Sequence, residues 1–185
     1  MIGNFMADSV KGNKKDLYPL MIRKGIELHR AIDSFTDQHS ITLESKIRLR
    51  PKYSKYSGVI VDLFYDHFLA KNFDLYSQVA LEDFTQATYQ TLNQNIQLLP
   101  ASVQLFLPYM IEKNWLLNYR SIEGIDRALT GLSKSVSFEN KMNESVNDLK
   151  TDYLLYENEF YRFFPQLITF AEGFSTNDTP SESKT

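Results

Sequence analysis

Two of the three histidines in this sequence are each accompanied by an aspartate. His29 and Asp33 are four residues apart, so on a helix they would project from one face, about one turn apart. Asp66 and His67 are adjacent in an apolar segment, and Asp62 comes four residues before Asp66. Ionisable groups in such a segment are costly unless they are paired or bind a metal. Mixed imidazole and carboxylate ligands suit Mn, Fe, Zn or Mg, which activate water or hold phosphate.

Each pair alone also has an ordinary explanation. A histidine and an aspartate four residues apart more often form a hydrogen bond, and the same holds for an Asp-His dipeptide. The conjunction of the two pairs favours a metal site. The third histidine, His39, lies in the expected loop 37–40 without such company, and we expect it to be exposed. The sequence has no cysteine, which excludes thiolate zinc and a cysteine nucleophile.

These side chains must be positioned by helices, because apolar residues recur at helical spacing almost throughout the chain. The sequence predicts an all-α fold, one helical bundle of about seven helices over residues 1–174, with a disordered tail at 175–185. Asp16 is the expected N-cap of a helix that reaches Phe35 and buries Met21. The helix 59–72 is apolar on nearly every side and should be central. A long helix over 140–170 should carry an aromatic core cluster and bend or end at Pro165.

Charge is unevenly distributed along the chain. Residues 1–55 hold 11 Lys and Arg and 6 Asp and Glu, a balance of +5, and the remainder hold 9 and 17, a balance of -8. A basic third on an acidic body could bind an anionic partner, or it could be an ordinary solvated face. No apolar run reaches membrane-spanning length, residues 1–10 lack the basic, apolar and small-residue pattern of a signal peptide, and no pattern typical of nucleic-acid binders is present. We therefore expect a soluble, cytoplasmic protein.

Three blocks of the sequence occur in an order and at intervals that resemble a known family. They are GNFMADSVKG from Gly3 to Gly12, HRAIDSFTD from His29 to Asp37, and YDHFL from Tyr65 to Leu69. Together with weaker likeness over the rest of residues 3–172, they resemble the acyl carrier protein phosphodiesterase family. That family is similar to a divergent branch of the all-helical HD-domain phosphohydrolases. The resemblance implies hydrolysis of the phosphodiester that joins phosphopantetheine to a serine of holo-acyl carrier protein, with Mn2+ favoured over Mg2+ or Fe2+.

The resemblance also implies roles for individual residues. The metal ligands and catalytic residues would be Asp8, His29, Asp33, Asp66 and His67. Lys11 and Arg30 would bind the phosphate, and Asp62 would orient a ligand. Family members usually begin with an additional segment of the type Asn-x-Leu-Ala-His, so we expect the reading frame to start further upstream. The alternatives are a phosphohydrolase of the same fold acting on another phosphate ester or nucleotide, and a non-catalytic protein that binds the carrier.

The expected mechanism is attack on phosphorus by a metal-activated water, with Arg30 balancing the charge that develops. Asp62 or water would protonate the leaving serine oxygen. Acyl carrier proteins are small and acidic, so the basic third would supply the docking surface. Its candidates are Lys14, Lys15, Arg23, Lys24, Arg48, Arg50, Lys52 and Lys55. This hypothesis requires His29 and His67 to converge on one cation.

Overall fold

The computed structural model describes residues 1–176, and within them every regular element is a helix. Its α-helices are α1 (Ile2–Met6), α2 (Leu20–Gln38), α3 (Ser40–Tyr53), α4 (Ser57–Lys71), α5 (Leu81–Gln94), α6 (Ala101–Glu112), α7 (Trp115–Asn118), α8 (Ile122–Ser135), α9 (Ser145–Thr151) and α10 (Tyr153–Thr176). Short 3-10 helices connect them: η1 (Ala7–Ser9), η2 (Gly12–Leu17), η3 (Ser54–Tyr56), η4 (Phe73–Leu75), η5 (Ile96–Leu98) and η6 (Met142–Glu144). The all-α prediction is confirmed. The count of about seven was low, because eight of the described α-helices have seven residues or more.

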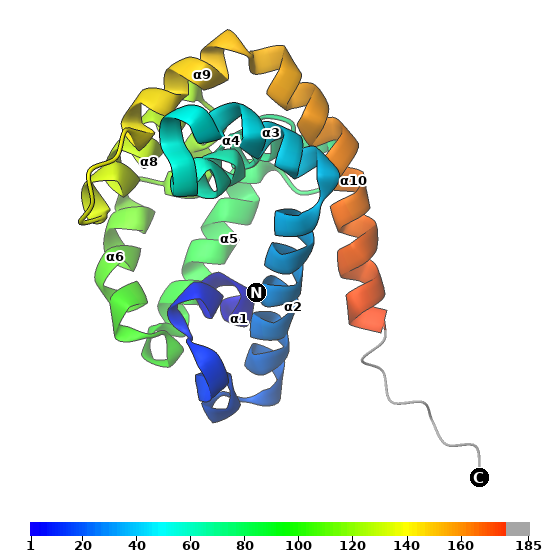
Figure 1. The fold of residues 1–185 in the computed structure, drawn as a ribbon. Helices are drawn as coiled ribbons and strands as arrows, with labels where there is room; N and C mark the ends of the chain where they lie inside the picture. Colours follow the sequence, from blue (N-terminus) through cyan, green and yellow to red (C-terminus); the bar gives the residue numbers. More distant parts are fainter. Residues whose placement is uncertain (177–185) are drawn as a thin grey trace.

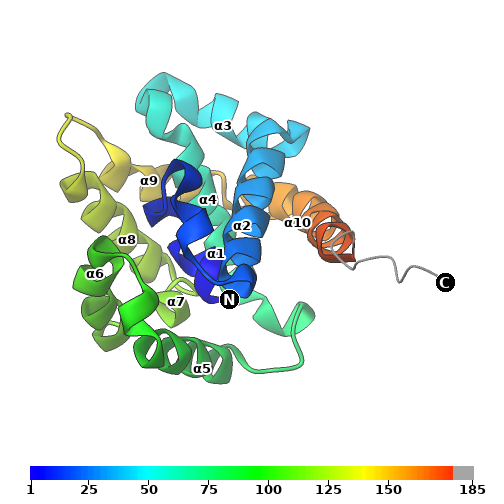
Figure 2. The same cartoon turned by 90° about the horizontal axis from the view of Figure 1, so that it is seen from below.

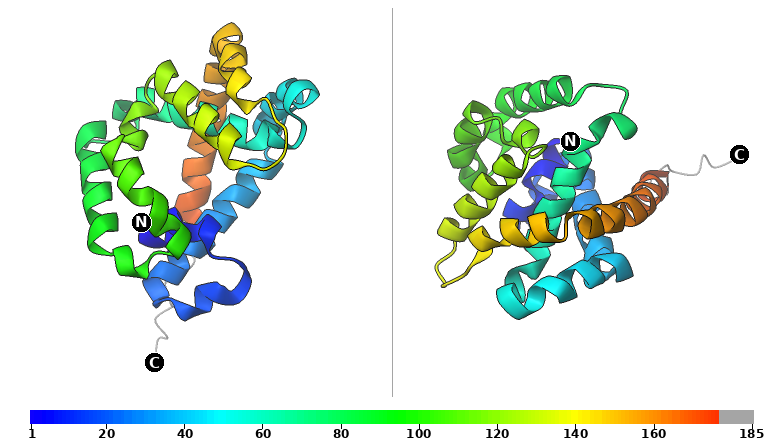
Figure 3. Two further views of the ribbon diagram at one scale, coloured as in Figure 1. Left: turned by 90° about the vertical axis from the view of Figure 1, so that its left-hand side faces the viewer. Right: turned by 90° about the horizontal axis from the view of Figure 1, so that it is seen from above.

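Helix α4 is central, as its apolar sequence predicts. Its Ile60, Phe64 and Phe68 are fully buried, in a cluster to which α3, α8, α9 and α10 also contribute. A second cluster joins α1 and α2 to α5 and α6. Figure 1 shows α10 running beside α2, and these two helices are in contact. Seen from below and from above, α5 lies on the opposite side of α4 from α3 (Figures 2 and 3).

Helix α1 approaches α2 more closely than side chains would allow. A Cβ atom added to Gly3 would lie 2.0 Å from the carbonyl oxygen of Ile22, and one added to Gly25 would lie 3.0 Å from the backbone nitrogen of Asn4. Only glycine permits this backbone contact. Since η1 follows α1 directly, the close crossing holds η1, and with it Asp8, against the middle of α2.

Several predicted boundaries were wrong. Helix α2 begins at Leu20 after Pro19, and Asp16 lies in η2 without capping it. The buried face of α2 carries Ile22 and Ile26, whereas Met21 is 78% exposed, because α1 covers the neighbouring face. The long helix predicted over 140–170 is broken between α9 and α10 at Asp152.

Some helices continue through a proline, including the one that was expected to bend or end at Pro165. Pro51 is within α3, and Pro165 is within α10, which continues to Thr176. Packing of the flanking turns offsets the hydrogen bond that each proline removes. The predicted tail 175–185 lies, from residue 177 onward, outside the described residues. Within the part of the chain that the structure describes, no helix is both long and apolar enough to cross a membrane.

His39 is not the exposed loop residue that the sequence suggested. It is partly buried between the rings of Phe35 and Phe163, with centroid distances of 5.2 and 5.0 Å. Its Nδ1 accepts a hydrogen bond from the backbone N–H of Ile41 at 3.3 Å, so it caps α3. Ser40 is the first residue of that helix.

Candidate metal centre

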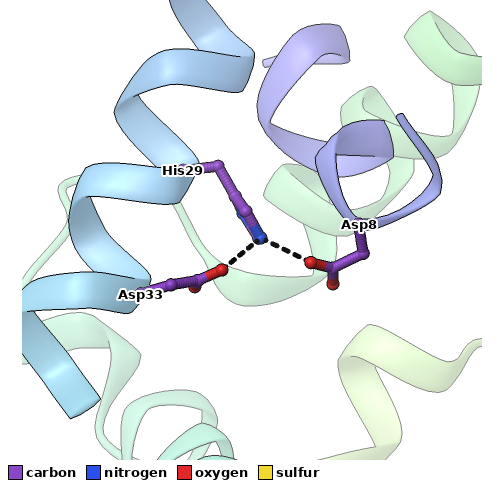
Figure 4. A group of neighbouring side chains, drawn as sticks. All are labelled: Asp8, His29 and Asp33. Atoms are coloured by element: carbon purple, nitrogen blue, oxygen red, sulfur yellow. Dashed lines mark hydrogen bonds and ion pairs between the residues drawn. The ribbon is translucent and has the colours of Figure 1, made fainter. Parts of the chain in front are cut away.

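Three of the predicted ligands converge at the point where η1 meets α2. Nε2 of His29 lies 3.1 Å from Oδ1 of Asp8 and 3.1 Å from Oδ2 of Asp33 (Figure 4). His29 and Asp33 share one face of α2 because they are one turn apart, as the sequence predicted. Asp8 reaches them from a different element, through the close crossing of α1 on α2.

This geometry fits a divalent cation. One ligand atom from each of the three residues lies within 4.8 Å of the others. An octahedral ion with ligand distances of about 2.1 Å separates adjacent ligands by about 3.0 Å, close to the two measured separations. One imidazole with two carboxylates is a donor set that Mn, Fe, Zn and Mg accept. The group could therefore hold such an ion and leave other positions for water and substrate.

The three groups influence one another's protonation. The hydrogen bond to Asp8 raises the pKa of His29 above its usual value, against the effect of burial, and Asp33 adds to the rise. The same hydrogen bond lowers the pKa of Asp8, whereas burial raises the pKa of Asp33. The two carboxylates thus favour the protonated form of His29, and a bound cation would have to replace that proton, because only unprotonated imidazole ligates metal.

The cluster lies at one side of a cavity of about 710 Å³ between α2, α4 and α10. Asp62 and Asp66 face this cavity from α4, and both were predicted site residues. The full lining is Asn4, Asp8, His29, Ile32, Asp33, Thr36, Asp37, Val59, Asp62, Leu63, Tyr65, Asp66, Leu69, Phe160, Phe163, Phe164 and Leu167. The cavity thus brings together five carboxylates, one imidazole and an apolar wall.

Asp62 and Asp66 each have a solvent-exposed side chain at the cavity, although the protein atoms around the cavity partly desolvate their carboxyl groups. Burial raises the pKa of Asp62 to about 6, although the nearby Lys46 ammonium opposes the rise. Burial, together with the charge of Asp62, raises the pKa of Asp66 to about 7. Perturbed carboxyl groups in a cavity are typical of functional sites.

The stability of the metal-free protein should fall as pH rises through the pKa values of these two carboxyls. Between pH of about 4 and about 7 the folded chain holds protons on Asp62 and Asp66 that the unfolded chain has released. The stability that these protons contribute is present at low pH and is lost above the folded pKa values. We expect Asp66→Asn to show a smaller drop in Tm than the wild type from pH 4.5 to 7.5, measured by calorimetry in chelator.

Asp74, exposed on η4 and absent from the cavity, supplies the control for this measurement. Asp74→Asn should retain the full drop in Tm. An equal drop in the wild type and in Asp66→Asn would show that ionisation of Asp66 does not oppose folding.

His67 does not lie with the other predicted ligands. It is 2% exposed, and its Nδ1 donates to the carbonyl oxygen of Tyr119 at 2.8 Å. Its Nε2 accepts from the hydroxyl of Tyr153 at 2.9 Å, and that hydroxyl accepts from Lys71 at 2.8 Å. Adjacent residues on a helix point about 100° apart, so only one of Asp66 and His67 can face the cavity. The hypothesis of one cation shared by both imidazoles is therefore wrong, since only His29 lies in the cluster with Asp8 and Asp33, and His67 instead ties α4 to α10 and to the segment after α7.

Replacing His67 with alanine should therefore cost stability and leave metal binding intact. The variant leaves the Tyr119 carbonyl, which is partly buried, without its hydrogen-bond donor. This loss should lower the free energy of unfolding by about 1–3 kcal/mol. Denaturant unfolding would measure this loss. Calorimetric titration with Mn2+ at low temperature should give an affinity within about threefold of the wild type. A folded variant that no longer binds Mn2+ would return His67 to the ligand set.

The predicted phosphate-binding cations, Lys11 and Arg30, are not on the cavity wall. Arg30 donates to the carbonyl oxygens of Val10 at 2.5 Å and Gly12 at 3.2 Å. It follows His29 directly on α2 and so points to a different side of the helix. The structure gives Arg30 a part in holding the loop after Asp8.

Three polar residues at or beside the cavity were missed. Asp37 continues the four-residue spacing of His29 and Asp33 along α2, and Asn4 precedes Asp8 by the same interval, so helical periodicity could have found both. Lys46 gave no local signal. Its Nζ lies 2.6 Å from Oδ1 of Asp37, and its side chain is 7% exposed, which places a buried cation beside the carboxylates.

The comparisons with known proteins agree on one family. The model of the acyl carrier protein phosphodiesterase family matches residues 1–167. The acyl carrier protein phosphodiesterase of Klebsiella pneumoniae (strain 342) is 33% identical over 175 residues, which cover 92% of this chain and 89% of the relative. That of Escherichia coli O6:H1 (strain CFT073) is 29% identical over 170 residues, which cover 90% and 86%. No solved structure matches the chain. The chain therefore belongs to the acyl carrier protein phosphodiesterase family.

Proposed function

We propose that this protein hydrolyses the phosphodiester between phosphopantetheine and the serine of holo-acyl carrier protein, using a divalent ion held by Asp8, His29 and Asp33. The observation that carries the proposal is the convergence of these three side chains at a large cavity, in a chain of this family. Mn2+ is the ion that we expect. When bound, it would supply a water of lowered pKa and offset the negative charge of the phosphate.

The carboxyls across the cavity supply the proton for the leaving group. Water adds to phosphorus, the bond from phosphorus to the serine oxygen breaks, and the products are phosphopantetheine and a free serine hydroxyl. The serine oxygen needs a proton as it leaves. Asp66, with a pKa of about 7, is protonated in about half of the molecules at neutral pH and is better suited than Asp62, with a pKa of about 6. We assign the general acid to Asp66 on this basis.

The experiment is direct. The purified protein is incubated with Mn2+ and holo-acyl carrier protein, and the carrier is weighed by mass spectrometry. Its mass should drop by one phosphopantetheine, and the drop should require the metal. A parallel panel of nucleotides and small phosphate esters tests the alternative. Turnover of that panel with an unchanged carrier mass would replace the proposal with a small-molecule phosphohydrolase.

The proposed docking surface is narrower than the sequence suggested. Lys15, Arg48 and Lys52 are paired with Glu27, Glu159 and Asp148 within the chain and are less available to a partner. Lys14, from the predicted docking set, and Lys11, which was predicted to bind phosphate, are both exposed and lie six and three residues after Asp8. We propose these two lysines as the contact with the acidic carrier.

Reversal of these charges should weaken carrier binding without affecting the chemistry. The double variant Lys11→Glu and Lys14→Glu should raise KM about tenfold at low salt, with kcat nearly unchanged, because charges at the edge of an interface steer association. Added salt should shrink the difference, since exposed charges are screened over about 8–10 Å. The control reverses Lys134 and Lys141, two exposed lysines on and after α8. An equal KM for both double variants would remove the docking proposal.

A further inference from the structure

The cavity has two chemically different sides. The carboxylates and the imidazole come from η1, α2 and α4, whereas α10 contributes only Phe160, Phe163, Phe164 and Leu167, which we call the aromatic wall. Their spacing of three, one and three residues places them on one face of the helix. Aromatic residues in this region were predicted as core packing, and Phe160 and Phe163 are indeed buried. Phe164 and Leu167 pack against this core but are only partly buried, so they supply the surface of the aromatic wall that a molecule in the cavity can reach.

The two sides differ in depth. The side chains of Asp8 and Asp33 are 84% and 53% exposed, so the metal ligands lie near the surface. Phe160 and Phe163 are 1% and 2% exposed, so the aromatic wall is internal. The volume of about 710 Å³ falls in the range of sites that enclose a small organic ligand, about 300–1,000 Å³. A metal ion and one phosphate would leave most of it unfilled.

We propose that the aromatic wall is the binding site for the pantetheine arm of the phosphodiester. This inference rests on the proposed function. One substituent of the phosphorus is a folded carrier protein, which is too large to enter the cavity. The other is a slender chain with methylene groups and a dimethyl-substituted carbon. A phosphate held at the surface cluster therefore directs the slender arm inward, where its apolar groups leave water. Thr36 and Asp37, which also line the cavity, offer polar atoms to the amides of the arm.

The test compares the two halves of the substrate. Phosphopantetheine and O-phosphoserine carry the same phosphate monoester, and only the first has the arm. Calorimetric titration of the full chain in Mn2+ should show phosphopantetheine binding at least about tenfold more tightly. Leu167→Ala should weaken phosphopantetheine binding about 5- to 20-fold, as expected for the loss of three partly buried carbon atoms, and leave phosphoserine binding unchanged.

Ile168 provides the matched control. It is the next residue on α10 and is also half-buried, but it does not line the cavity. Ile168→Ala should bind both ligands as the wild type does. Phe164→Leu, a milder change in the aromatic wall, covers the case in which Leu167→Ala does not fold. Equal affinity of the wild type for the two halves, or unchanged phosphopantetheine binding in folded aromatic-wall variants, would overturn the inference.

The binding test is independent of turnover, so the two proposals can fail separately. Release of the arm from holo-acyl carrier protein with no preference between the halves would leave the proposed function standing and remove the aromatic wall as a subsite. Tighter binding of phosphopantetheine that depends on Leu167, without any release of the arm from the carrier, would support the aromatic wall as a subsite and remove the proposed function.

Discussion

Replacing His29 with alanine should abolish measurable release of phosphopantetheine and weaken Mn2+ binding by more than about 100-fold. His29 contributes the atom that lies 3.1 Å from both carboxylates, so its removal leaves two acids with no donor between them. Loss of residues that merely support metal ligands costs about 10- to 100-fold, and loss of a ligand should cost more. The measurements are calorimetric titration with Mn2+ and the carrier mass after incubation.

The same experiment distinguishes the three histidines. His39→Ala removes an imidazole that caps α3, and His67→Ala removes one that joins helices, so both should retain Mn2+ binding while losing stability. His29 is half-buried at the edge of the cavity, and its replacement should change stability least in the metal-free protein. Normal Mn2+ affinity in a folded His29→Ala protein would dismiss the proposed metal centre.

Gly3→Ala should damage the metal centre from a distance. The added methyl group would lie 2.0 Å from the carbonyl oxygen of Ile22, so α1 must move away from α2. Overpacking of this kind costs about 1–3 kcal/mol of unfolding free energy. Because η1 follows α1 without a linker, the shift also withdraws Asp8 from His29. We expect at least tenfold weaker Mn2+ binding together with a lower Tm.

Gly131 offers a control of the same chemistry. It lies within α8, and a Cβ atom there would meet no atom within 4 Å. Gly131→Ala should stabilise the protein by about 0.5–1 kcal/mol, because alanine is favoured over glycine inside a helix. Its Mn2+ affinity should equal that of the wild type. If Gly3→Ala behaved in the same way, the crossing of α1 on α2 would not be what positions Asp8.

Features that depend on helical periodicity could be read from the sequence. The pairing of His29 with Asp33, the common direction of Asp62 and Asp66, and the burial of α4 all follow from residues spaced along one helix. The all-α class follows from the same pattern. The prediction that Asp8 lies near His29 and Asp33 of α2 came from the agreement of three sequence blocks with one family. Patterns among neighbouring residues do not predict such a contact.

Features that depend on how helices cross could not be read. Asp66 and His67 are adjacent, and periodicity cannot tell which of them faces α2. Arg30 follows His29 directly, which made it a reasonable candidate for binding phosphate. In the folded chain its guanidinium donates to the backbone carbonyls of Val10 and Gly12 in the loop after Asp8. The buried Lys46 beside Asp37 depends on the packing of α3 against α2, which only the three-dimensional arrangement reveals.

The division of the proposed metal ligands between η1 and α2 would tie uptake of the ion to the integrity of the first nine residues. An ion bound by both elements would cross-link them, because the N-terminal segment could not dissociate from α2 without losing a ligand of the ion. Binding to the folded chain alone also shifts the folding equilibrium in proportion to the logarithm of the free ion concentration. Metal supply would then set how long the N-terminal segment stays docked, as well as how fast the enzyme turns over.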